Sequence, residues 1–219
     1  NHNLIYDNKS INRYKFAINS SAKTSRDREL LELRNEVEKI KNCKLRKSAK
    51  NIVFSDGNPN SKIMIIGEGP GANEDMEGMP FIGRAGHLLD KMLESINLSR
   101  KSVYITNVVN YRPPENRSPT EEEIQKYIPF LIRHIEIINP KILLLLGSTA
   151  LNTIIGNDEV ISNVRGKWIE KEIGKCKTSI IASFHPAFLI RQPTQKAMSW
   201  VDLKMIRKKI LDLKINIEK

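Results

Sequence analysis

Four short apolar runs recur along the chain, and they constrain its fold more than any other feature. The runs are residues 62–66, 103–107, 141–146 and 177–182. Short apolar runs bounded by turn residues are typical of buried strands. Segments with helical periodicity lie near residues 84–96, from Thr120 onward and after Gly147. Strands that alternate with helices predict an α/β fold whose parallel sheet is covered on both faces.

Apolar residues spaced by three or four positions define three of the helices more closely. We expect the first over residues 27–42, and its apolar stripe is Leu30, Leu33, Val37 and Ile40. The second begins with a capping box at residues 120–123, and Pro129 is expected to kink it. The apolar positions of the last helix are Leu203, Ile206, Ile210, Leu213 and Ile217. A short strand at residues 51–54 and a turn at residues 56–59 are also expected.

The length of 219 residues suits one domain. Residues 1–25 lack a sustained apolar period, so we expect a loose extension there and a single domain over residues 26–219. The chain has 36 Lys and Arg against 25 Asp and Glu, a formal net charge of +11. Such an excess favours a polyanionic partner, nucleic acid before membrane. A lysine-rich genome would produce the same balance, so charge alone leaves both interpretations open.

The two cysteines, Cys43 and Cys176, are too few for a disulfide framework or a four-thiolate metal site. No apolar run approaches the length of a membrane span, and the start of the chain lacks the apolar core of a signal peptide. The sequence is therefore interpreted as a cytoplasmic protein without a membrane partner, and a monomer is expected.

Unusual loops follow all four apolar runs, at residues 67–75, 107–119, 147–150 and 183–193. In an open α/β sheet, ligands bind beyond the carboxyl ends of the strands. We therefore expect these loops to meet at one edge of the sheet. The first loop contains three glycines, one proline and three acidic residues, but it matches neither a P-loop nor a dinucleotide fingerprint.

Five side chains in or near these loops are candidates for chemistry: Glu68, Glu74, Phe81, Asn107 and His185. Taken singly, each has a plain structural interpretation, such as a turn, a cap or a core ring. Taken together, they describe a pocket for an extruded nucleobase. An aromatic ring can stack on the base, an amide can read an edge with one carbonyl and one N–H, and an imidazole can donate to a carbonyl that gains charge.

With these candidate residues, the sequence resembles the family 4 uracil-DNA glycosylases, the thermostable iron–sulfur type. The resemblance spans roughly residues 40–215. The motifs that carry it are Gly67-Glu68-Gly69-Pro70-Gly71 with Glu74-Asp75, then residues 78–86, 105–109, 112–117, 165–168 and 185–191. The family fold is a three-layer α/β/α sandwich with a central, mainly parallel, four-stranded sheet.

The resemblance implies a role for each residue around the uracil. Phe81 stacks on the flipped base, and Asn107 reads its O4 and N3–H, which rejects cytosine. His185 stabilises the charge that develops on O2. Glu68 and Gly69 line the sugar side, where water attacks C1′.

Other roles implied by the resemblance lie nearer the DNA. Glu74 lies near the pocket and guards against the 5-methyl group of thymine, and Asn116 positions substrate or water. Phe188, Leu189 and Arg191 are candidates to enter the minor groove. The residues themselves, apart from the resemblance, favour phosphate contacts around the rim for Arg84, Arg112, Arg117, Arg133, Arg165, Arg191 and several lysines.

The implied activity is hydrolysis of the N-glycosidic bond of uracil in single- or double-stranded DNA, the first step of base excision repair. The enzyme would be monofunctional, because no lysine occupies a motif position as a Schiff-base nucleophile. A related family with the motif Gly-Gln-Asp-Pro-Tyr-His holds the water with its Asp, and Gly69 takes that place here. Either Glu68 or Glu74 is expected to activate the water instead.

One departure from the family concerns its 4Fe-4S cluster, which four cysteines bind. Those positions here are Ile40, Cys43, Tyr111 and Tyr127. A single thiolate cannot hold the cluster, so no cofactor is predicted. The four residues are expected to pack as a small apolar plug.

Two other functions remain open. The chain is either a DNA- or polymerase-binding relative with weak or no turnover, or a glycosylase with wider substrates such as hypoxanthine or mismatched thymine. The complete set Glu68, Phe81, Asn107 and His185 argues against a mere binder, and Asn107 favours uracil.

Overall fold

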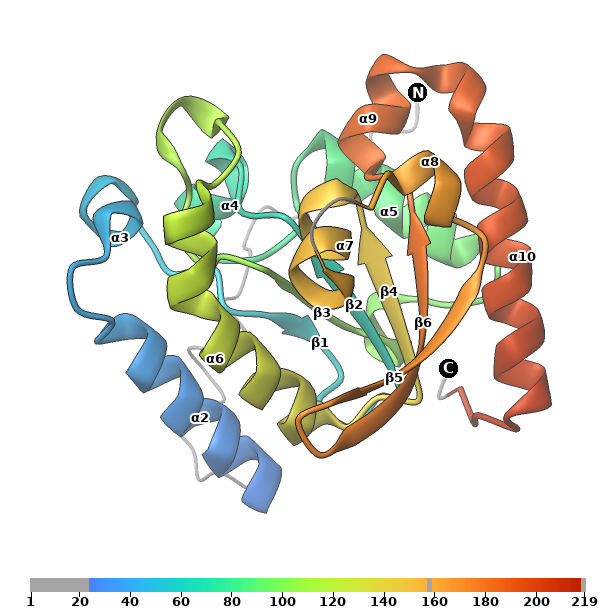
Figure 1. The fold of residues 1–219 in the computed structure, drawn as a ribbon, viewed down its shortest axis with the longest axis horizontal. Helices are drawn as coiled ribbons and strands as arrows, with labels where there is room; N and C mark the ends of the chain where they lie inside the picture. The colour runs from blue at the N-terminus through green and yellow to red at the C-terminus, as the bar shows by residue number, and fades with distance from the viewer. Residues whose placement is uncertain (1–23, 157–158, 218–219) are drawn as a thin grey trace, which may run out of the picture.

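The computed structural model describes residues 24–156 and 159–217, and a six-stranded sheet lies at its centre (Figure 1). The strands are β1 Asp56–Gly57, β2 Ile63–Gly67, β3 Tyr104–Asn107, β4 Ile142–Leu146, β5 Trp168–Ile173 and β6 Cys176–Ser183. Their order across the sheet is β1-β3-β2-β4-β6-β5. The four inner strands pair in parallel, and β1 and β5 pair antiparallel at the two edges. The predicted parallel core of four strands is confirmed, with one further strand on each side.

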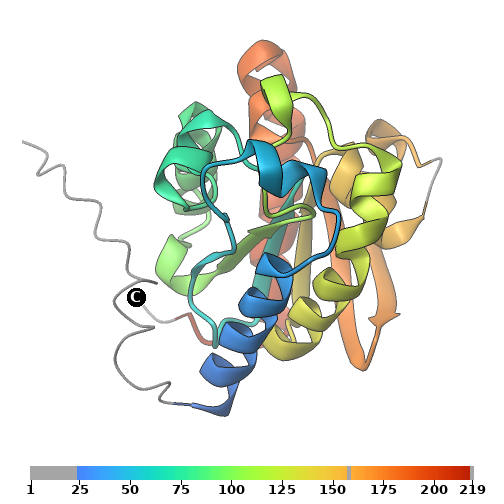
Figure 2. The same cartoon turned by 90° about the vertical axis from the view of Figure 1, so that its left-hand side faces the viewer.

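Helices cover both faces of the sheet, as the α/β prediction requires (Figures 1 and 2). The α-helices are α2 Ser25–Glu38, α3 Lys44–Ser48, α4 Ala72–Glu77, α5 Arg84–Glu94, α6 Glu121–Ile138, α7 Ser148–Ile155, α8 Ile161–Val164, α9 Pro186–Arg191 and α10 Lys196–Asp212. Short 3-10 helices are η1 Arg100–Ser102, η2 Pro114–Asn116 and η3 Pro193–Gln195. One layer contains α2, α6 and α7, and the other contains α5, α9 and α10.

The period of two along each strand divides the core between the two layers. In β2, Met64 and Ile66 pack toward α2 and α6, whereas Ile63 and Ile65 pack toward α5 and α10. All five residues of β2 are buried, which is why its sequence is a continuous apolar run rather than an alternating one.

The carboxyl ends of the parallel strands lie at one edge of the sheet. Gly67 is in register with Asn107, and Leu146 is in register with Ser183. Figure 1 shows the arrows of β4 and β6 ending on the side of α9. The four unusual loops therefore leave the sheet at the same edge, as expected.

The edge strands were not predicted correctly. No strand forms at residues 51–54; instead the amide of Val53 donates to the carbonyl of Asn110 at 2.8 Å. The antiparallel edge strand β1 occupies part of the expected turn at residues 56–59. β5 was missed because it is partly exposed and rich in charge, and its partner in the hairpin, β6, decides its conformation.

Several helix boundaries also differ from the predictions. The first helix begins at Ser25, with Thr24 as its cap, and ends at Glu38, so Ile40 lies beyond it. The capping box at Thr120 is present, and α6 continues through Pro129 without interruption. The last helix ends at Asp212, before two of its expected apolar positions. The predicted extension lies almost wholly in residues 1–23, outside the described part of the chain.

Two expected loops contain short helices. Residues 67–75 enter α4 at Ala72, and residues 183–193 contain α9, which Pro186 begins and His185 caps. Proline at the first helical position is pre-organised for this conformation. None of the described helices is both long and apolar enough to cross a membrane.

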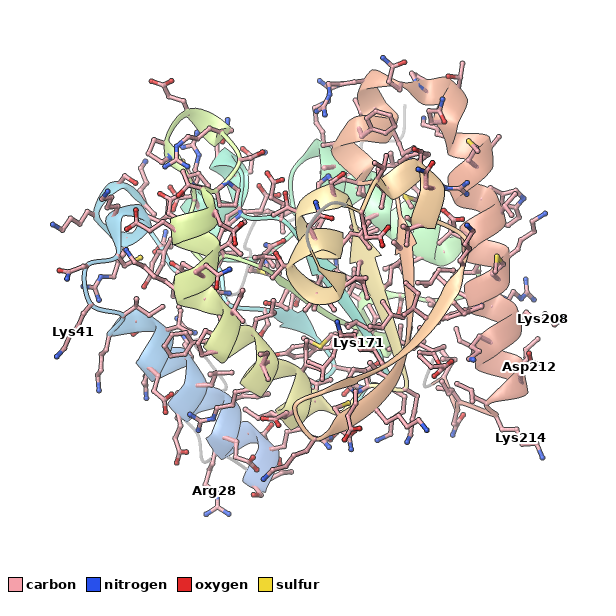
Figure 3. All side chains as sticks on the ribbon, in the orientation of Figure 1. Arg28, Lys41, Lys171, Lys208, Asp212 and Lys214 are labelled. Carbon is pink, nitrogen blue, oxygen red and sulfur yellow. The ribbon has the colours of Figure 1, made fainter. Side chains whose placement is uncertain are left out.

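Basic side chains are spread over the surface rather than confined to the strand-end edge. Lys41 and Lys208 project from opposite sides of the molecule (Figure 3). The positive charge therefore acts as a general attraction to a polyanion and does not by itself locate a binding site.

The buried histidine His134, on α6, is expected to make the folded protein less stable at mildly acidic pH. Its ring is buried, stacks on Phe54 with ring centroids 4.6 Å apart, and places Nε2 2.8 Å from the hydroxyl of Tyr104. Burial lowers the pKa of His134 from 6.5 to about 3. The unfolded chain takes up this proton near pH 6.5 and the folded chain does not. The stability that the neutral ring supplies is therefore present above pH 6.5 and is lost as the pH falls toward 3.

Replacing His134 with glutamine is expected to make the free energy of unfolding less dependent on pH. The slope between pH 6 and pH 5 should fall by up to about 1.4 kcal/mol per pH unit, the value for one proton. Urea denaturation at each pH measures this slope. His87→Gln, at an exposed ring on α5, is the control. Equal slopes in wild type and His134→Gln would contradict the prediction.

Candidate active site

The ring of Phe81 and the amide of Asn107 meet over the backbone of Gly67. A Cβ atom at residue 67 would lie 2.4 Å from Cζ of Phe81 and 2.5 Å from Oδ1 of Asn107. Only a residue without a side chain fits between them. The glycine that ends β2 therefore lets an aromatic ring and a strand-end amide share one small space.

His185 completes this cluster from the other half of the sheet. Its ring centroid lies 5.6 Å from that of Phe81, with the two planes inclined by 31°. A Cβ added at Gly147 would lie 3.1 Å from Cβ of His185, and Gly147 has φ +89°, so the loop after β4 favours a glycine beside the imidazole. The ring, the amide and the imidazole, which come from three separate loops, are thus gathered in one place.

Arg100 holds the backbone of Phe81, and the sequence did not reveal this role. Phe81 has a left-handed backbone with φ +55°, which is strained for a residue with a side chain. Arg100 donates to the carbonyl oxygens of Pro80, at 3.0 Å, and Phe81. It also forms ion pairs at 2.8 Å with Asp56 on β1 and Asp90 on α5. No motif surrounds Arg100, so only the fold brings these partners together.

Replacing Arg100 with alanine is expected to lower the free energy of unfolding by about 2–3 kcal/mol, because two partly buried carboxylates and two carbonyls lose their donor. Arg34→Ala, which removes an ion pair between residues four apart on α2, should cost no more than about 0.5 kcal/mol. Urea denaturation of both variants measures the difference. Similar losses in the two would show that Arg100 has no special role in the loop.

The carboxylate of Glu74 stabilises the loop that contains Phe81. Its Oε1 accepts hydrogen bonds from the amides of Ile82, at 2.9 Å, and Gly83, at 2.8 Å. Gly83 is the N-cap of α5 and has no side chain to cap the helix itself. The carboxylate of Glu74 therefore supplies the cap and places negative charge at the positive end of the helix.

The carboxylate of Glu68 contacts α7, where the hydroxyl of Thr149 donates to its Oε2. Glu68 is partly exposed, so its carboxylate is accessible to water. Gly69 packs closely on Val109, since an added Cβ would lie 2.8 Å from Cγ2 of that residue. Thr149 is a second partner that the sequence did not reveal.

The imidazole of His185 is neutral, and the position of its proton follows from its contacts. Nδ1 accepts a hydrogen bond from the amide of Ala187 at 3.1 Å, so the proton of the neutral ring is on Nε2. Burial, with a smaller contribution from Arg191, lowers the pKa of His185 from 6.5 to about 4 against the opposing effect of Glu68 and Glu74. The ring is therefore a neutral N–H donor at physiological pH.

The side-chain oxygen of Asn107 is unpaired among the described residues. The residue is only 3% exposed, and Oδ1 has no hydrogen-bond partner within the described part of the chain. A buried acceptor without a donor costs about 1–3 kcal/mol. Such an atom beside an aromatic ring indicates a ligand that brings an N–H group into the cluster.

The rim residues on α5 and α9 differ in their exposure. Arg84, the first residue of α5, and Arg191, the last of α9, are both exposed. Phe188 is partly exposed and packs on Phe184, with ring centroids 5.0 Å apart. Leu189 is only 1% exposed and belongs to the core beneath α9, so in this conformation it cannot enter a duplex. Phe188 and Arg191 therefore stay the predicted residues of α9 for insertion into the DNA duplex.

Three further predicted site residues follow β3. Arg112 donates through Nε to Oδ1 of Asn116 at 2.8 Å, and both lie at the surface near η2. Arg117 forms two hydrogen bonds of 2.8 Å with Glu123 at the start of α6. This pairing lowers the pKa of Glu123 to about 2. Arg117 therefore stabilises the N-terminus of α6, and its contact with DNA remains a prediction.

Arg165 differs from the other predicted DNA contacts because its side chain is largely buried. It forms an ion pair with Asp202 on α10, which is fully buried. This burial differs from the exposed rim position that the sequence suggested for Arg165.

The four cluster positions of the family pack together in the core beside α6. Ile40, Cys43, Tyr111 and Tyr127 are all buried in the same hydrophobic cluster. The sulfur of Cys43 lies 3.2 Å from the hydroxyl of Tyr127, and burial raises the pKa of Tyr111 to about 12. Among the described residues, no group of three or more His, Cys, Asp or Glu side chains is placed to hold a metal ion. The residues at this position do not fit an iron–sulfur cluster.

A hollow of about 380 Å³ lies between α6 and α7. Its wall includes Thr149, the partner of Glu68, together with residues such as Ile124, Asn152 and Thr153. Phe81, Asn107 and His185 do not line it. The hollow therefore borders the cluster on the side of Glu68 but does not form the space between the ring and the amide.

The fold and the strand-end cluster match one class of protein. A family model described as "Uracil DNA glycosylase superfamily" matches residues 54–207, which include Phe81, Asn107 and His185. The match therefore extends over all six described strands of the sheet and over the three loops that form the cluster.

Curated relatives are more specific. The chain is 44% identical over 165 residues to the type-4 uracil-DNA glycosylase of Thermotoga maritima, covering 74% of this chain and 84% of that protein. It is 41% identical over 175 residues to the type-4 uracil-DNA glycosylase of Archaeoglobus fulgidus, with coverage of 78% and 88%. The corresponding protein of Saccharolobus solfataricus is 39% identical over 189 residues, with coverage of 84% and 88%. The chain therefore belongs to the uracil-DNA glycosylase superfamily and, within it, to the type-4 branch.

Proposed function

We propose that this chain is a monofunctional uracil-DNA glycosylase that flips uracil out of DNA and hydrolyses its N-glycosidic bond, which initiates base excision repair. The observation that carries the proposal is Oδ1 of Asn107, which has no partner in residues 24–156 and 159–217 and lies beside the rings of Phe81 and His185. The names of the type-4 relatives support the same activity.

Recognition of uracil follows from the chemistry of the amide. Oδ1 of Asn107 accepts from N3–H of the base, and Nδ2 donates to O4, while Phe81 stacks on the ring. Cytosine has an unprotonated N3, which is an acceptor, and a 4-amino group, which is a donor. Oδ1 of Asn107 would therefore face an acceptor, and Nδ2 would face a donor. The buried amide would then be left unpaired, which strongly disfavours that base.

Catalysis follows from the neutral imidazole. As the bond between C1′ and N1 breaks, its electron pair moves into the uracil ring and charge develops on O2. Nε2–H of His185 donates to O2, and one such donor contributes about 3–4 kcal/mol in a site closed to water. The sugar becomes an oxocarbenium-like cation, and water attacks C1′. The products are uracil and an abasic site.

Glu68 is the better candidate to take the proton from the attacking water. Oε1 of Glu74 already accepts two backbone hydrogen bonds in the Phe81 loop. Glu68 is accessible and is oriented by Thr149. In this proposal Glu74 shapes the pocket wall that faces the 5-position of the base. Asn116 remains a candidate for positioning substrate at the surface.

We further propose that the enzyme works without the 4Fe-4S cluster of its family. The one thiol at the cluster positions, Cys43, is engaged with Tyr127, and aromatic and aliphatic side chains occupy the other three places. Iron analysis and visible absorbance of anaerobically purified protein test this, and near-stoichiometric iron would contradict it. The cytoplasmic location, the monomeric state and the choice between single- and double-stranded DNA stay predictions.

A labelled oligonucleotide with one deoxyuridine tests the activity. Release of uracil with an alkali-sensitive but unbroken strand is the expected result, and the same strand with deoxycytidine or thymidine should not react. Binding without release would favour the alternative, a DNA-binding relative without turnover. Release of hypoxanthine or mismatched thymine at a comparable rate would instead indicate wider substrates.

A further inference from the structure

The residues that lead into His185 are held from the side of α10. Ser183 ends β6, two residues before His185, and is fully buried. Its hydroxyl donates to Oδ2 of Asp202 on α10 at 2.7 Å. Asp202 is itself 0% exposed, and Arg165 donates to both of its carboxylate oxygens, through Nε at 3.1 Å and through Nη2 at 2.5 Å.

Arg165 also contacts the residue between Ser183 and His185. Its guanidinium carbon lies 5.4 Å from the ring centroid of Phe184, and Nη2 donates to the carbonyl of Met198 on α10. The backbone of Ser183 is held from the other side, because its carbonyl accepts from the amide of Gly147 at 3.0 Å. The segment that carries the imidazole is thus fastened on both sides.

Gly166 shows how closely the loop of Arg165 approaches Asp202. Its backbone has φ +68°, and an added Cβ would lie 2.9 Å from Oδ1 of Asp202. Arg165-Gly166 thus brings a guanidinium against the carboxylate and leaves no room for another side chain beside it. Arg165 and Gly166 thus have a structural role within the motif at residues 165–168, which the proposed chemistry does not use.

The burial of this pair also bears on how DNA is bound. The side chain of Arg165 is only 9% exposed, so a contact with a phosphate would require the guanidinium to leave Asp202, whose buried carboxylate would then have no opposite charge beside it. The protein interior strongly penalises an uncompensated charge. A rim arginine such as Arg191 is exposed and incurs no such penalty.

We propose that Arg165 and Asp202 are positioning residues, which hold Ser183 and Phe184 so that Nε2 of His185 faces the flipped base, and that Arg165 does not contact DNA phosphate. This inference rests on the proposed function of His185. It predicts that disturbing the pair slows the chemical step more than it weakens DNA binding.

The test uses the paired replacement of Arg165→Met and Asp202→Leu, which removes both charges together, and the milder Ser183→Ala. Single-turnover uracil release at saturating DNA should slow by about 10–100-fold in the paired variant, because small displacements of a catalytic group cost about this much. DNA affinity should change less than about threefold, with the same dependence on salt. Arg191→Ala is the positive control, and its salt slope should fall by about one unit.

Two outcomes would overturn the proposal. A salt slope reduced by about one unit in the paired variant would identify a phosphate contact, and an unchanged single-turnover rate in both folded variants would remove the positioning role. Melting curves establish which variants are folded. If the paired variant is not folded, the single-turnover rate of Ser183→Ala tests the positioning role.

The ring-proton NMR signals of His185 in the free protein, assigned with His185→Gln, provide a readout that does not depend on turnover. They should shift in both variants, and unshifted signals would refute the positioning role. A wild-type protein that releases no uracil would refute the proposed function, whereas the NMR result would still decide the positioning of the imidazole.

Discussion

Replacing His185 with alanine is expected to slow uracil release by about 10²–10³-fold while DNA binding changes little, because the lost donor acts on charge that develops only in the transition state. Single-turnover rates at saturating DNA measure the first effect, and fluorescence anisotropy with an uncleavable analogue measures the second. His185→Gln retains an amide donor and should lose less activity. An equal loss of rate and affinity in His185→Ala would show that the residue docks DNA instead.

The pH dependence of the rate tests the neutral state of the same ring. Burial lowers the pKa of His185 to about 4, and the N–H of Ala187 occupies Nδ1. Protonation of Nδ1 would break that cap, so the ring should remain in its working state from pH 8 down to about 5. A decline in the single-turnover rate centred near pH 6.5, the ordinary value for histidine, would contradict this assignment.

Replacing Asn107 with alanine is expected to abolish most of the activity and yet not destabilise the protein. The variant loses the amide that reads uracil, so kcat/KM should fall by at least about 10²-fold. The buried Oδ1 has no partner within the described residues, so its removal should raise the free energy of unfolding by up to about 1–2 kcal/mol. A gain in stability with a loss of activity is the signature of a group kept for a ligand.

Asn110 offers a matched control three residues further along the chain. It is also buried, but Nδ2 donates to the carbonyls of Val53, at 3.1 Å, and Phe54, at 3.3 Å. Asn110→Ala should therefore lower the free energy of unfolding by about 1–2 kcal/mol. Urea denaturation of both variants measures the contrast. Equal destabilisation by the two substitutions would contradict the role of Asn107 as an unpaired reader.

The central sheet and the long helices were predictable because their signals are local. The buried strands appear in the sequence as apolar runs, and the start of α6 appears as a capping box that the structure contains. The convergence of the loops followed from the parallel order of the strands. Phe81, Asn107 and His185 could therefore be proposed as one cluster before their positions were known.

The edge strands and the partners of the site residues were not predictable in the same way. β1 has only two residues, and β5 is polar and is ordered by β6. Leu189 was expected to enter DNA, but α9 turns it into the core. Arg165 was expected at the rim, but it reaches a carboxylate 37 residues away.

The amino-acid sequence by itself determined which residues form the parallel strands, where α6 begins and which side chains belong to the strand-end loops, because the spacing of apolar residues and helix capping are local properties of the chain. Only the tertiary structure decided that Arg100 supports Phe81, that Thr149 orients Glu68 and that Arg165 is buried against Asp202. A charged or polar side chain has many partners of suitable chemistry along the chain. Its partner is selected by which segments the packed sheet and helices bring within hydrogen-bond distance, and that selection is not a local property of the sequence.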